Sequence, residues 1–336
     1  MLNVTLFTRK DSKPCDEIRV ELTKLQSQYP HRLIEVDIDS DAVLVAKYAQ
    51  SIPVVEAGPY ALKYPITSQK LKMTIGAAFD RKNQLEKLED PEYKQRVQKG
   101  RSITTGDRVS SWIARRYLLI LNLFMLLYVG LPFLAPTLMK LNAVLPAQII
   151  YRMYKPLCHQ FGFRSFFLYG EQPYYPLAEA RLQGVKTFEE VTGLANLSDP
   201  YSFTRFEARN YIGDDAVGYK VALCERDIAI YLAILGFGII FGLTGRRFKS
   251  LHWMLWLLIG IAPIGLDGFS QLFSQFNWDW LASLVPYRES TPFLRAFTGA
   301  LFGFATAWFA YPNIEESMSE TRQYYIKKFA VHQASD

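Results

Sequence analysis

The chain of 336 residues is poor in cysteine and lacks the motifs of several enzyme classes. Its three cysteines are too few for a disulfide scaffold or for a four-cysteine zinc or iron–sulfur site. It contains neither a phosphate-binding glycine loop nor a dinucleotide fingerprint, and no basic and aromatic stripe indicates a nucleic-acid surface. The first residues lack the basic start and cleavage site of a secretory signal. With 50% hydrophobic residues, the chain is not a disordered one either.

Residues 1–85 have the pattern of a small α/β domain. Alternating apolar residues predict strands near Val4, over 31–39 and near Val54, and helical spacing separates them. The expected order is strand, helix, strand, helix, strand, strand, helix. A charged stretch poor in apolar residues follows, and it is interpreted as a linker over 86–114.

Long apolar runs lie almost entirely beyond Tyr117, and they predict a helical membrane domain over 115–312. A helix needs about 20 residues to cross the hydrocarbon of a bilayer, so the two shorter runs depend on flanking aromatic residues. The expected fold is therefore an α/β domain joined to an all-α bundle of about four transmembrane helices. The spans are expected at about 117–139, 228–243, 251–266 and 293–311.

Basic residues flank the predicted spans on one side of the bundle, and the positive-inside tendency places that side in the cytoplasm. Both termini, including the tail 313–336, are then cytoplasmic in a multi-pass protein of the cell membrane. An insertion over about 171–223 is expected outside, and the lipid bilayer is an expected partner. The basic clusters are Arg108, Arg115 and Arg116 before the first span, Arg246, Arg247 and Lys249 between the second and third, and Lys327 and Lys328 after the fourth.

The segment TRKDSKPCDE and the later Ile52-Pro53 resemble glutaredoxin-like proteins of the thioredoxin superfamily. This resemblance covers about residues 1–85 and implies a thioredoxin-like fold. In that family a CxxC motif begins the first helix, whose N-terminus lowers the pKa of the nucleophilic first thiol, and a proline in the position of Pro53 packs near it. Here the motif reads Ser12-Lys13-Pro14-Cys15.

A serine therefore occupies the position of the family's nucleophile, and only Cys15 remains. Because a hydroxyl lacks the thiolate chemistry that attacks a disulfide, ordinary dithiol reductase activity is not expected from this domain. The domain is interpreted as a degenerate docking module. Two interpretations of Cys15 remain open: a packed thiol, or a helix-start thiol that is glutathionylated or senses oxidants.

Four motifs of the second half resemble, in the same order, a prokaryotic family of predicted membrane proteins known as domain of unknown function 2085. The family supplies architecture and no established activity. It usually places the first two motifs close together, so 171–223 is interpreted as an additional outer lobe. The motifs are Cys158-His159-Gln160 with Arg164-Ser165-Phe166; Cys224-Glu225-Arg226-Asp227; Asp267 with Gln271; and Arg288-Glu289-Ser290 with Arg295.

The polar residues of these motifs are expected near the outer membrane boundary, where charged groups are costly unless they are paired or hydrated. They form either an ion-paired lid or a functional pocket, in which Asp227 and Asp267 are expected to neutralise Arg226 and Arg295. This outer-face cluster comprises Arg164, Arg226, Asp227, Asp267, Gln271, Arg288 and Arg295.

Three interpretations of the two outer cysteines remain open. Cys158 and Cys224 form a disulfide or redox pair, which a compartment outside the cytoplasm permits. Alternatively they contribute to a zinc site with His159 and Asp267, although no ligand spacing requires one. They can also be separate packed thiols.

Two functions are consistent with these observations. The first is a multi-pass membrane accessory or scaffold protein, whose degenerate domain or outer lobe docks a partner protein. The second is a membrane thiol–disulfide oxidoreductase or redox sensor that uses Cys158 and Cys224. A quinone or glutathione is compatible with the second, although no motif indicates a cofactor. Cys15 is not expected to exchange with the outer pair, because about 30 Å of hydrocarbon separates them.

Overall fold

The computed structural model describes all residues except 89–99, 101, 200–201, 276–286 and 334–336. The chain forms two compact units. The first comprises Met1–Tyr117 together with Glu316–Asp336, and the second comprises Leu118–Glu315. Much of the predicted linker over 86–114 lies outside the described residues, so its conformation stays a prediction.

The first unit is built on a four-stranded sheet, as its alternating apolar residues predict. β1 pairs with β2 in parallel and with β3 in antiparallel orientation, and β3 and β4 form a hairpin. At the hairpin turn Gly58 has a φ of 56°, which glycine adopts without steric strain. In the order β2-β1-β3-β4, the sheet contains β1 (Leu2–Thr8), β2 (His31–Asp37), β3 (Val54–Ala57) and β4 (Tyr60–Lys63).

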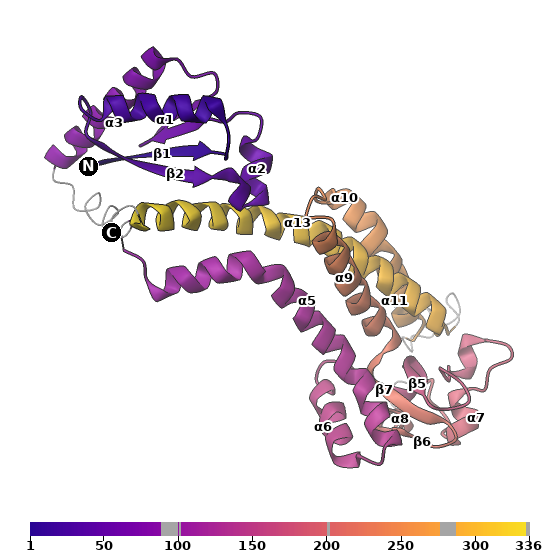
Figure 1. Ribbon diagram of the computed structural model, residues 1–336. Helices are drawn as coiled ribbons and strands as arrows, with labels where there is room; N and C mark the ends of the chain where they lie inside the picture. The colour runs from indigo at the N-terminus through magenta and orange to yellow at the C-terminus, as the bar shows by residue number, and fades with distance from the viewer. Residues whose placement is uncertain (89–99, 101, 200–201, 276–286, 334–336) are drawn as a thin grey trace. The chain divides into compact units, whose positions relative to one another are not determined.

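Helices cover both faces of this sheet (Figure 1). Successive side chains of a strand point to opposite faces, so Leu6 and Phe7 of β1 enter different apolar clusters. The cluster of Leu6 is closed by α1 (Lys13–Leu25) and α3 (Ser68–Lys87), and that of Phe7 by α2 (Ala42–Tyr48). This arrangement confirms the predicted α/β fold and the order of its elements.

The last helix of the chain also packs on the Phe7 side of the sheet. α13 (Pro292–Gln333) continues well beyond the predicted fourth span, and Ile326 and Ala330 near its end contact the cluster of Phe7. The segment 313–336, expected to be only a tail, is therefore helical as far as Gln333 and completes the core of the first unit.

Ion pairs fix this end of α13 to the first unit. The buried Arg322 guanidinium donates to the Asp41 carboxylate at 3.0 Å and to the Ala114 carbonyl at 3.0 Å. Lys327 donates to the Glu56 carboxylate at 2.7 Å. Because the partners come from α5, β3 and the start of α2, these contacts hold three separate segments against one helix.

Within the described residues, four helices are long and apolar enough to cross a membrane, which confirms the predicted membrane bundle. Many of their apolar side chains are exposed, among them Leu119 and Leu127 at 60% and 54%, as contact with lipid requires. Each helix extends past its predicted apolar run, because polar residues continue the helix at one or both ends. The four are α5 (Thr105–Lys140), α9 (Glu225–Leu243), the segment Trp253–Ser274 and α13.

The third of these helices is not uniformly α-helical. It consists of α10 (Trp253–Leu255), a π-helical stretch (Trp256–Ile261) and α11 (Ala262–Ser274). Pro263 lies in the first turn of α11, where its missing N–H disrupts the preceding hydrogen-bond ladder. The sequence predicted a span at this place and did not indicate the change of helical geometry.

Glycines allow α13 to approach α9 closely. A Cβ atom on Gly299 would lie 2.7 Å from the Arg226 carbonyl oxygen, and one on Gly303 would lie 2.2 Å from the Ile230 carbonyl oxygen. The two positions follow each other in the same direction along both helices, so α9 and α13 run parallel. Inside lipid the hydrophobic effect does not drive helices together, because lipid chains are as apolar as the side chains. Close backbone contact of this kind stabilises helix association there instead.

A small sheet in the second unit was not predicted, since this half was expected to be all-helical apart from its insertion. β7 pairs with both β5 and β6 in antiparallel orientation, and it leads directly into α9 at Cys224. β5 and β6 contain four and two residues, which makes their alternation hard to recognise in the sequence. The elements are α6 (Val144–Tyr154), β5 (Ser165–Leu168), α7 (Phe188–Thr192), α8 (Thr204–Asn210), β6 (Gly213–Asp214) and β7 (Gly218–Cys224).

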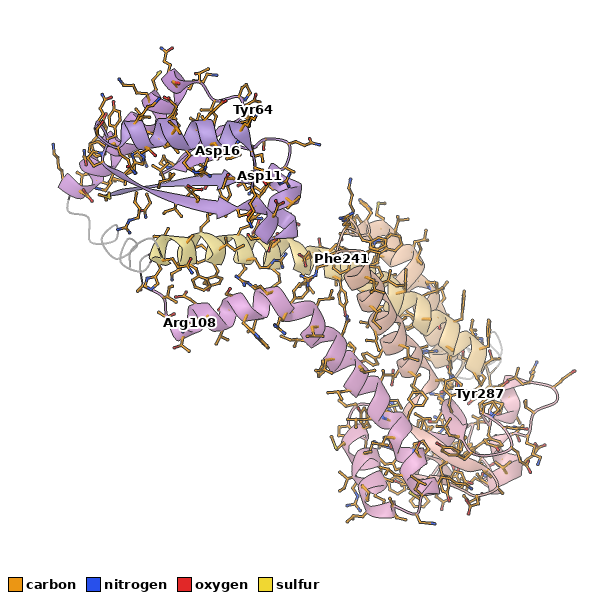
Figure 2. The ribbon with its side chains drawn as sticks, in the orientation of Figure 1. Asp11, Asp16, Tyr64, Arg108, Phe241 and Tyr287 are labelled. Atoms are coloured by element: carbon orange, nitrogen blue, oxygen red, sulfur yellow. The ribbon has the colours of Figure 1, made fainter. Side chains whose placement is uncertain are left out.

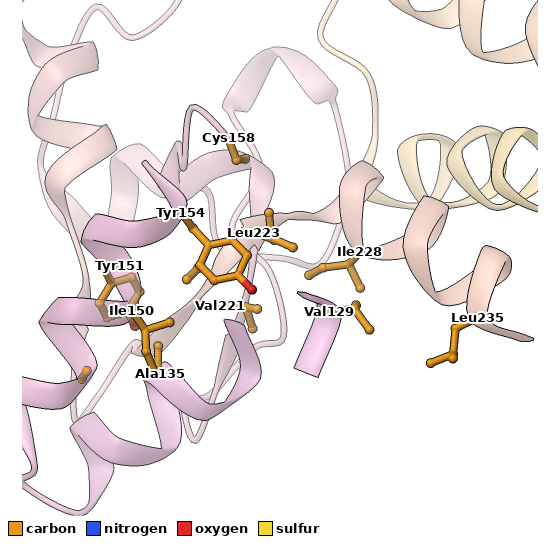
Figure 3. Packing of buried hydrophobic residues seen from close by; sticks show 12 residues of the cluster. Val129, Ala135, Ile150, Tyr151, Tyr154, Cys158, Val221, Leu223, Ile228 and Leu235 are labelled. Carbon is orange, nitrogen blue, oxygen red and sulfur yellow. The ribbon is translucent and has the colours of Figure 1, made fainter. Parts of the chain in front are cut away.

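One apolar cluster joins this lobe to the membrane helices. Figure 3 shows Tyr154 of α6 beside Val221 and Leu223 of β7, with Val129 of α5 and Ile228 of α9 nearby. The Tyr154 hydroxyl also donates to the Tyr128 carbonyl of α5 at 2.7 Å. The lobe is therefore packed on the bundle rather than attached by a flexible connection.

Arg322→Gln is expected to loosen the first unit, because it leaves the carboxylate of Asp41 without its guanidinium partner. We expect a loss of about 2–3 kcal/mol of local stability, below the full cost of a buried pair because Asp41 retains some exposure. Hydrogen exchange of the β1 and β2 amides in the detergent-solubilised full chain measures it. The control Lys24→Gln, which removes an exposed pair with Glu21, should leave exchange unchanged, and equal exchange in both variants would contradict the role given to Arg322.

Candidate functional site

The thiol of the first unit is not accessible. Cys15 lies in the first turn of α1 and is 0% exposed, and its amide donates to the Ser12 carbonyl at 2.9 Å. Ser12 is the N-cap residue of the helix, and Ile52-Pro53 is a cis peptide, as the family resemblance implies. A buried thiol beside a serine offers no nucleophile to a substrate disulfide.

The two cysteines of the second unit lie next to each other. Cys158 follows α6, and its amide donates to the Tyr154 carbonyl at 3.0 Å. Cys224 ends β7 and is the N-cap residue of α9, where it faces Ser165 across the sheet. Both are free thiols, and their sulfur atoms lie within 4.8 Å of each other. Residues far apart in the sequence therefore form one thiol pair.

The two thiols are not equivalent. The Cys224 thiol donates a hydrogen bond to the sulfur of Cys158, which lowers the pKa of Cys158, and the Gln160 amide approaches the same sulfur at 3.5 Å. The pKa of Cys224 is raised well above its usual value by that hydrogen bond, by burial and by the nearby Asp227. Cys158 is therefore the thiol that ionises first.

A cavity of about 270 Å³ opens beside the pair. Its wall contains both sulfur-bearing residues, and three guanidinium groups of the polar cluster also border it. A small reagent can thus reach Cys158 from this cavity. The lining residues are Leu157, Cys158, His159, Gln160, Phe161, Arg164, Cys224, Arg226, Asp227, Gln271 and Arg295.

The members of the predicted polar cluster form two ion-pair networks, apart from Asp227, which lies beside the two thiols. In the first, Asp267 accepts from Arg226 at 2.5 Å, from Arg288 at 2.8 Å and from the Ser290 hydroxyl at 2.8 Å. Asp267 is 5% exposed, so this carboxylate is fully surrounded by donors. The predicted pairing of Asp267 with an arginine is confirmed, and Arg288 is a second partner that was not anticipated.

The second network centres on Arg295, which is 3% exposed. Arg295 donates to Glu225 at 3.1 Å and also to Glu289, which in turn accepts from Arg164 at 2.8 Å and from Gln271 at 2.7 Å. The aspartates Asp227 and Asp267 were expected to neutralise Arg295 together with Arg226, and for Arg295 this is wrong, since Glu225 and Glu289 take that place.

Glu225 and Glu289 complete this cluster and were not among the residues predicted from the sequence. Both stand inside the motifs that carry the family resemblance, which was the available signal. Glu289 also accepts a hydrogen bond from the side-chain amide of Gln275 at 3.2 Å. The same amide lies 3.5 Å from the hydroxyl of Tyr287, which is labelled in Figure 2. These contacts tie the segment before α13 to the end of α11.

The proposed metal ligands are only partly brought together. In the described part of the chain, the three side chains that can share one ion here are Cys158, Cys224 and Asp227, whose ligand atoms lie within 4.8 Å of one another. Asp267 is instead committed to its own network, and the exposed His159 ring stacks on Phe161 at 5.7 Å. A metal ion at this place would be coordinated by two thiolates and one carboxylate.

Two family models match this chain. Residues 3–76 match the glutaredoxin-like domain (DUF836), and residues 216–309 match the predicted membrane protein (DUF2085). These matches confirm both resemblances. No curated protein and no solved structure matches the chain. The second match includes Cys224, Arg226, Asp267 and Arg295 and ends before the last part of α13.

Arg295→Gln is expected to destabilise the second unit strongly, because it leaves the buried Glu225 carboxylate without its counter-charge and leaves Glu289 with Arg164 alone. Removal of one partner of a buried ion pair typically costs about 3–5 kcal/mol. Thermal unfolding of the full chain in detergent measures the loss. The control Lys140→Gln removes an exposed pair with Asp215, so its midpoint should equal that of the unmodified chain. An Arg295→Gln midpoint equal to that of the control would contradict the central position of Arg295.

Proposed function

We propose that this protein is a membrane thiol–disulfide redox protein whose reacting group is the pair Cys158 and Cys224. The observation that carries the proposal is the closeness of the two sulfur atoms, within 4.8 Å, at the wall of a cavity. A disulfide needs a separation of about 2.05 Å, which side-chain rotation supplies when the sulfur atoms are already neighbours. Of the two functions considered from the sequence, this arrangement supports the oxidoreductase.

The first unit is proposed to dock a partner rather than to transfer electrons. Its thiol is fully buried, and its nucleophile position carries Ser12. The end of α13 also fills part of the core of this unit, so the membrane helix and the docking unit share one structural element. The scaffold role expected from the sequence then belongs to this unit.

The proposed exchange partner is a disulfide, RSSR, of a small molecule or of an exposed protein loop. The Cys158 thiolate attacks one sulfur of RSSR, a Cys158–SR bond forms, and the first RS⁻ leaves and takes up a proton. The Cys224 thiolate then attacks the Cys158 sulfur, and the second RS⁻ leaves and is protonated. Two thiols and RSSR thus become one Cys158–Cys224 disulfide and two RSH, with two electrons passed to the substrate.

We further propose that the thiol pair lies outside the cytoplasm and both chain termini lie inside. The end of the bundle opposite the thiol pair carries Arg246 and Lys249, next to the part of α13 that contacts Ser250. α5 and α13 both leave the second unit at that end. Basic residues at this end agree with the positive-inside tendency.

Cys224→Ser should trap a mixed disulfide on Cys158, because the resolving thiol is gone. The full chain in detergent is equilibrated with glutathione disulfide, alkylated and analysed by mass spectrometry. We expect glutathione on Cys158 in this variant, an internal disulfide in the unmodified chain, and no adduct on Cys224 in Cys158→Ser. The control Cys15→Ser should behave as the unmodified chain. Absence of any Cys158 adduct or internal disulfide, or retention of one zinc ion per reduced chain, would contradict the redox proposal.

The proposed topology is tested with single cysteines in a background that lacks the three native ones. Gln183→Cys and Lys10→Cys place exposed thiols in the second-unit lobe and in the first unit. In intact cells a membrane-impermeant maleimide should label the thiol at position 183 and leave that at position 10 unlabelled until the cells are lysed. Labelling of position 10 in intact cells would contradict the orientation.

A further inference from the structure

A second cavity of the lobe, of about 210 Å³, is lined by four cationic side chains and by no carboxylate. Its cations come from three elements, namely the end of α6, α8 and β7. Gln160 separates this cavity from the one beside the thiols, because it lines both. The lining residues are Gln148, Tyr151, Arg152, Lys155, Gln160, Arg209, Asn210, Ile212 and Lys220.

The contacts of these cations leave their charge uncompensated. Lys220 donates to the Gln160 carbonyl at 2.8 Å and to the Arg209 carbonyl at 2.6 Å, and Lys155 donates to the Asn210 amide oxygen at 2.7 Å. Arg209 donates to the Lys155 carbonyl at 2.9 Å. All of these acceptors are neutral, and within the described ranges none of the four cations forms an ion pair.

Lys220 is the most deeply buried of the four cations, with 1% of its surface exposed. Burial, together with the positive charges of Lys155 and Arg209, lowers its pKa to about 7, although the nearby Cys158 thiol acts in the opposite direction. An anion in the cavity would offset both effects, since it adds an opposite charge where like charges now repel one another. The site therefore favours a negatively charged ligand with several acceptor oxygens.

α6 presents an apolar surface next to this cavity. One face of the helix is buried and contains Ala147, Ile150 and Tyr154. The outward face is apolar as well, with Leu145 and Ile149 exposed at 72% and 50%, and Met153 continues it at the same spacing of four residues. Exposed apolar residues in such a row are not expected in water.

This apolar row continues an exposed apolar surface of the membrane helix α5. Leu134 near the end of α5 is exposed, and so are Leu141 and Val144 in the short connection and at the start of α6. Gln148 and Arg152 stand three positions after Leu145 and Ile149, and residues three apart are neighbours on a helix surface, so the cationic cavity borders the apolar row. A molecule with an anionic head and long apolar chains matches both features together.

We propose that this cavity binds the phosphate of an anionic phospholipid, whose acyl chains lie along the outward face of α6. Arg152 and Lys155 bind the phosphate oxygens from the side of the membrane, and Lys220 and Arg209 bind from the inside of the lobe. Apolar contact along α6 holds the chains of the same lipid. The inference is independent of the redox chemistry proposed above.

Delipidated full chain in detergent is titrated with phosphatidylglycerol or phosphatidylcholine, and bound lipid is counted by native mass spectrometry. We expect one retained phosphatidylglycerol, bound more tightly than phosphatidylcholine. Arg152→Gln combined with Lys155→Gln should weaken phosphatidylglycerol binding at least about tenfold, since each charge-assisted hydrogen bond contributes more than about 1.4 kcal/mol. The matched control Lys140→Gln with Lys186→Gln removes two cations from exposed ion pairs and should bind normally.

A second variant separates a lipid from a free anion. Ile149→Gln leaves every cation in place and should weaken phosphatidylglycerol binding while the thermal midpoint without lipid is unchanged. Inorganic phosphate alone should raise the midpoint less than phosphatidylglycerol does. Equal stabilisation by phosphate, or equal lipid binding by the cavity variant and its control, would overturn the proposal.

Discussion

Arg295 holds together the end of the membrane bundle at which the two thiols lie. Its guanidinium is almost fully buried and binds Glu225 at the start of α9 and Glu289 in the segment before α13. Buried ions of this kind each cost several kcal/mol of desolvation, which only close and complete pairing repays. Because Glu225 directly follows Cys224, the same contact that satisfies Arg295 also fixes the backbone that carries the Cys224 sulfur.

The charged cluster and the thiol pair therefore belong to one arrangement. The cluster holds the starts of α9 and α13 and the end of α11, and the small sheet brings Cys158 to the place where α9 begins. The cavity opens between these elements, so its shape depends on ion pairs as well as on apolar packing. The first unit contributes no accessible thiol, and the end of α13 fills part of its core.

The sequence predicted the features that depend on local patterns. Alternation and helical spacing were enough for the first sheet and the four apolar helices. The three-stranded sheet was missed because β6 has two residues and β5 pairs with β7 at long range, and the exact partners of Arg295 were missed because they come from different elements. Cys158 and Cys224 were expected to be close in two of the three open alternatives, the disulfide or redox pair and the zinc site. The sequence did not decide among the three, since separation in sequence says nothing of separation in space. The helical end of α13 was taken for a tail, because its charged residues conceal the apolar positions of Ile326 and Ala330.

The central claim is that Cys158 and Cys224 exchange reversibly between two thiols and one disulfide. The most direct measurement is differential alkylation of both residues in living cells under reducing and oxidising growth conditions, followed by mass spectrometry of the intact chain. The account predicts that the fraction of the Cys158–Cys224 disulfide changes between the two conditions, while Cys15 stays reduced. A pair that is always fully oxidised, or always fully reduced, under both conditions would contradict it.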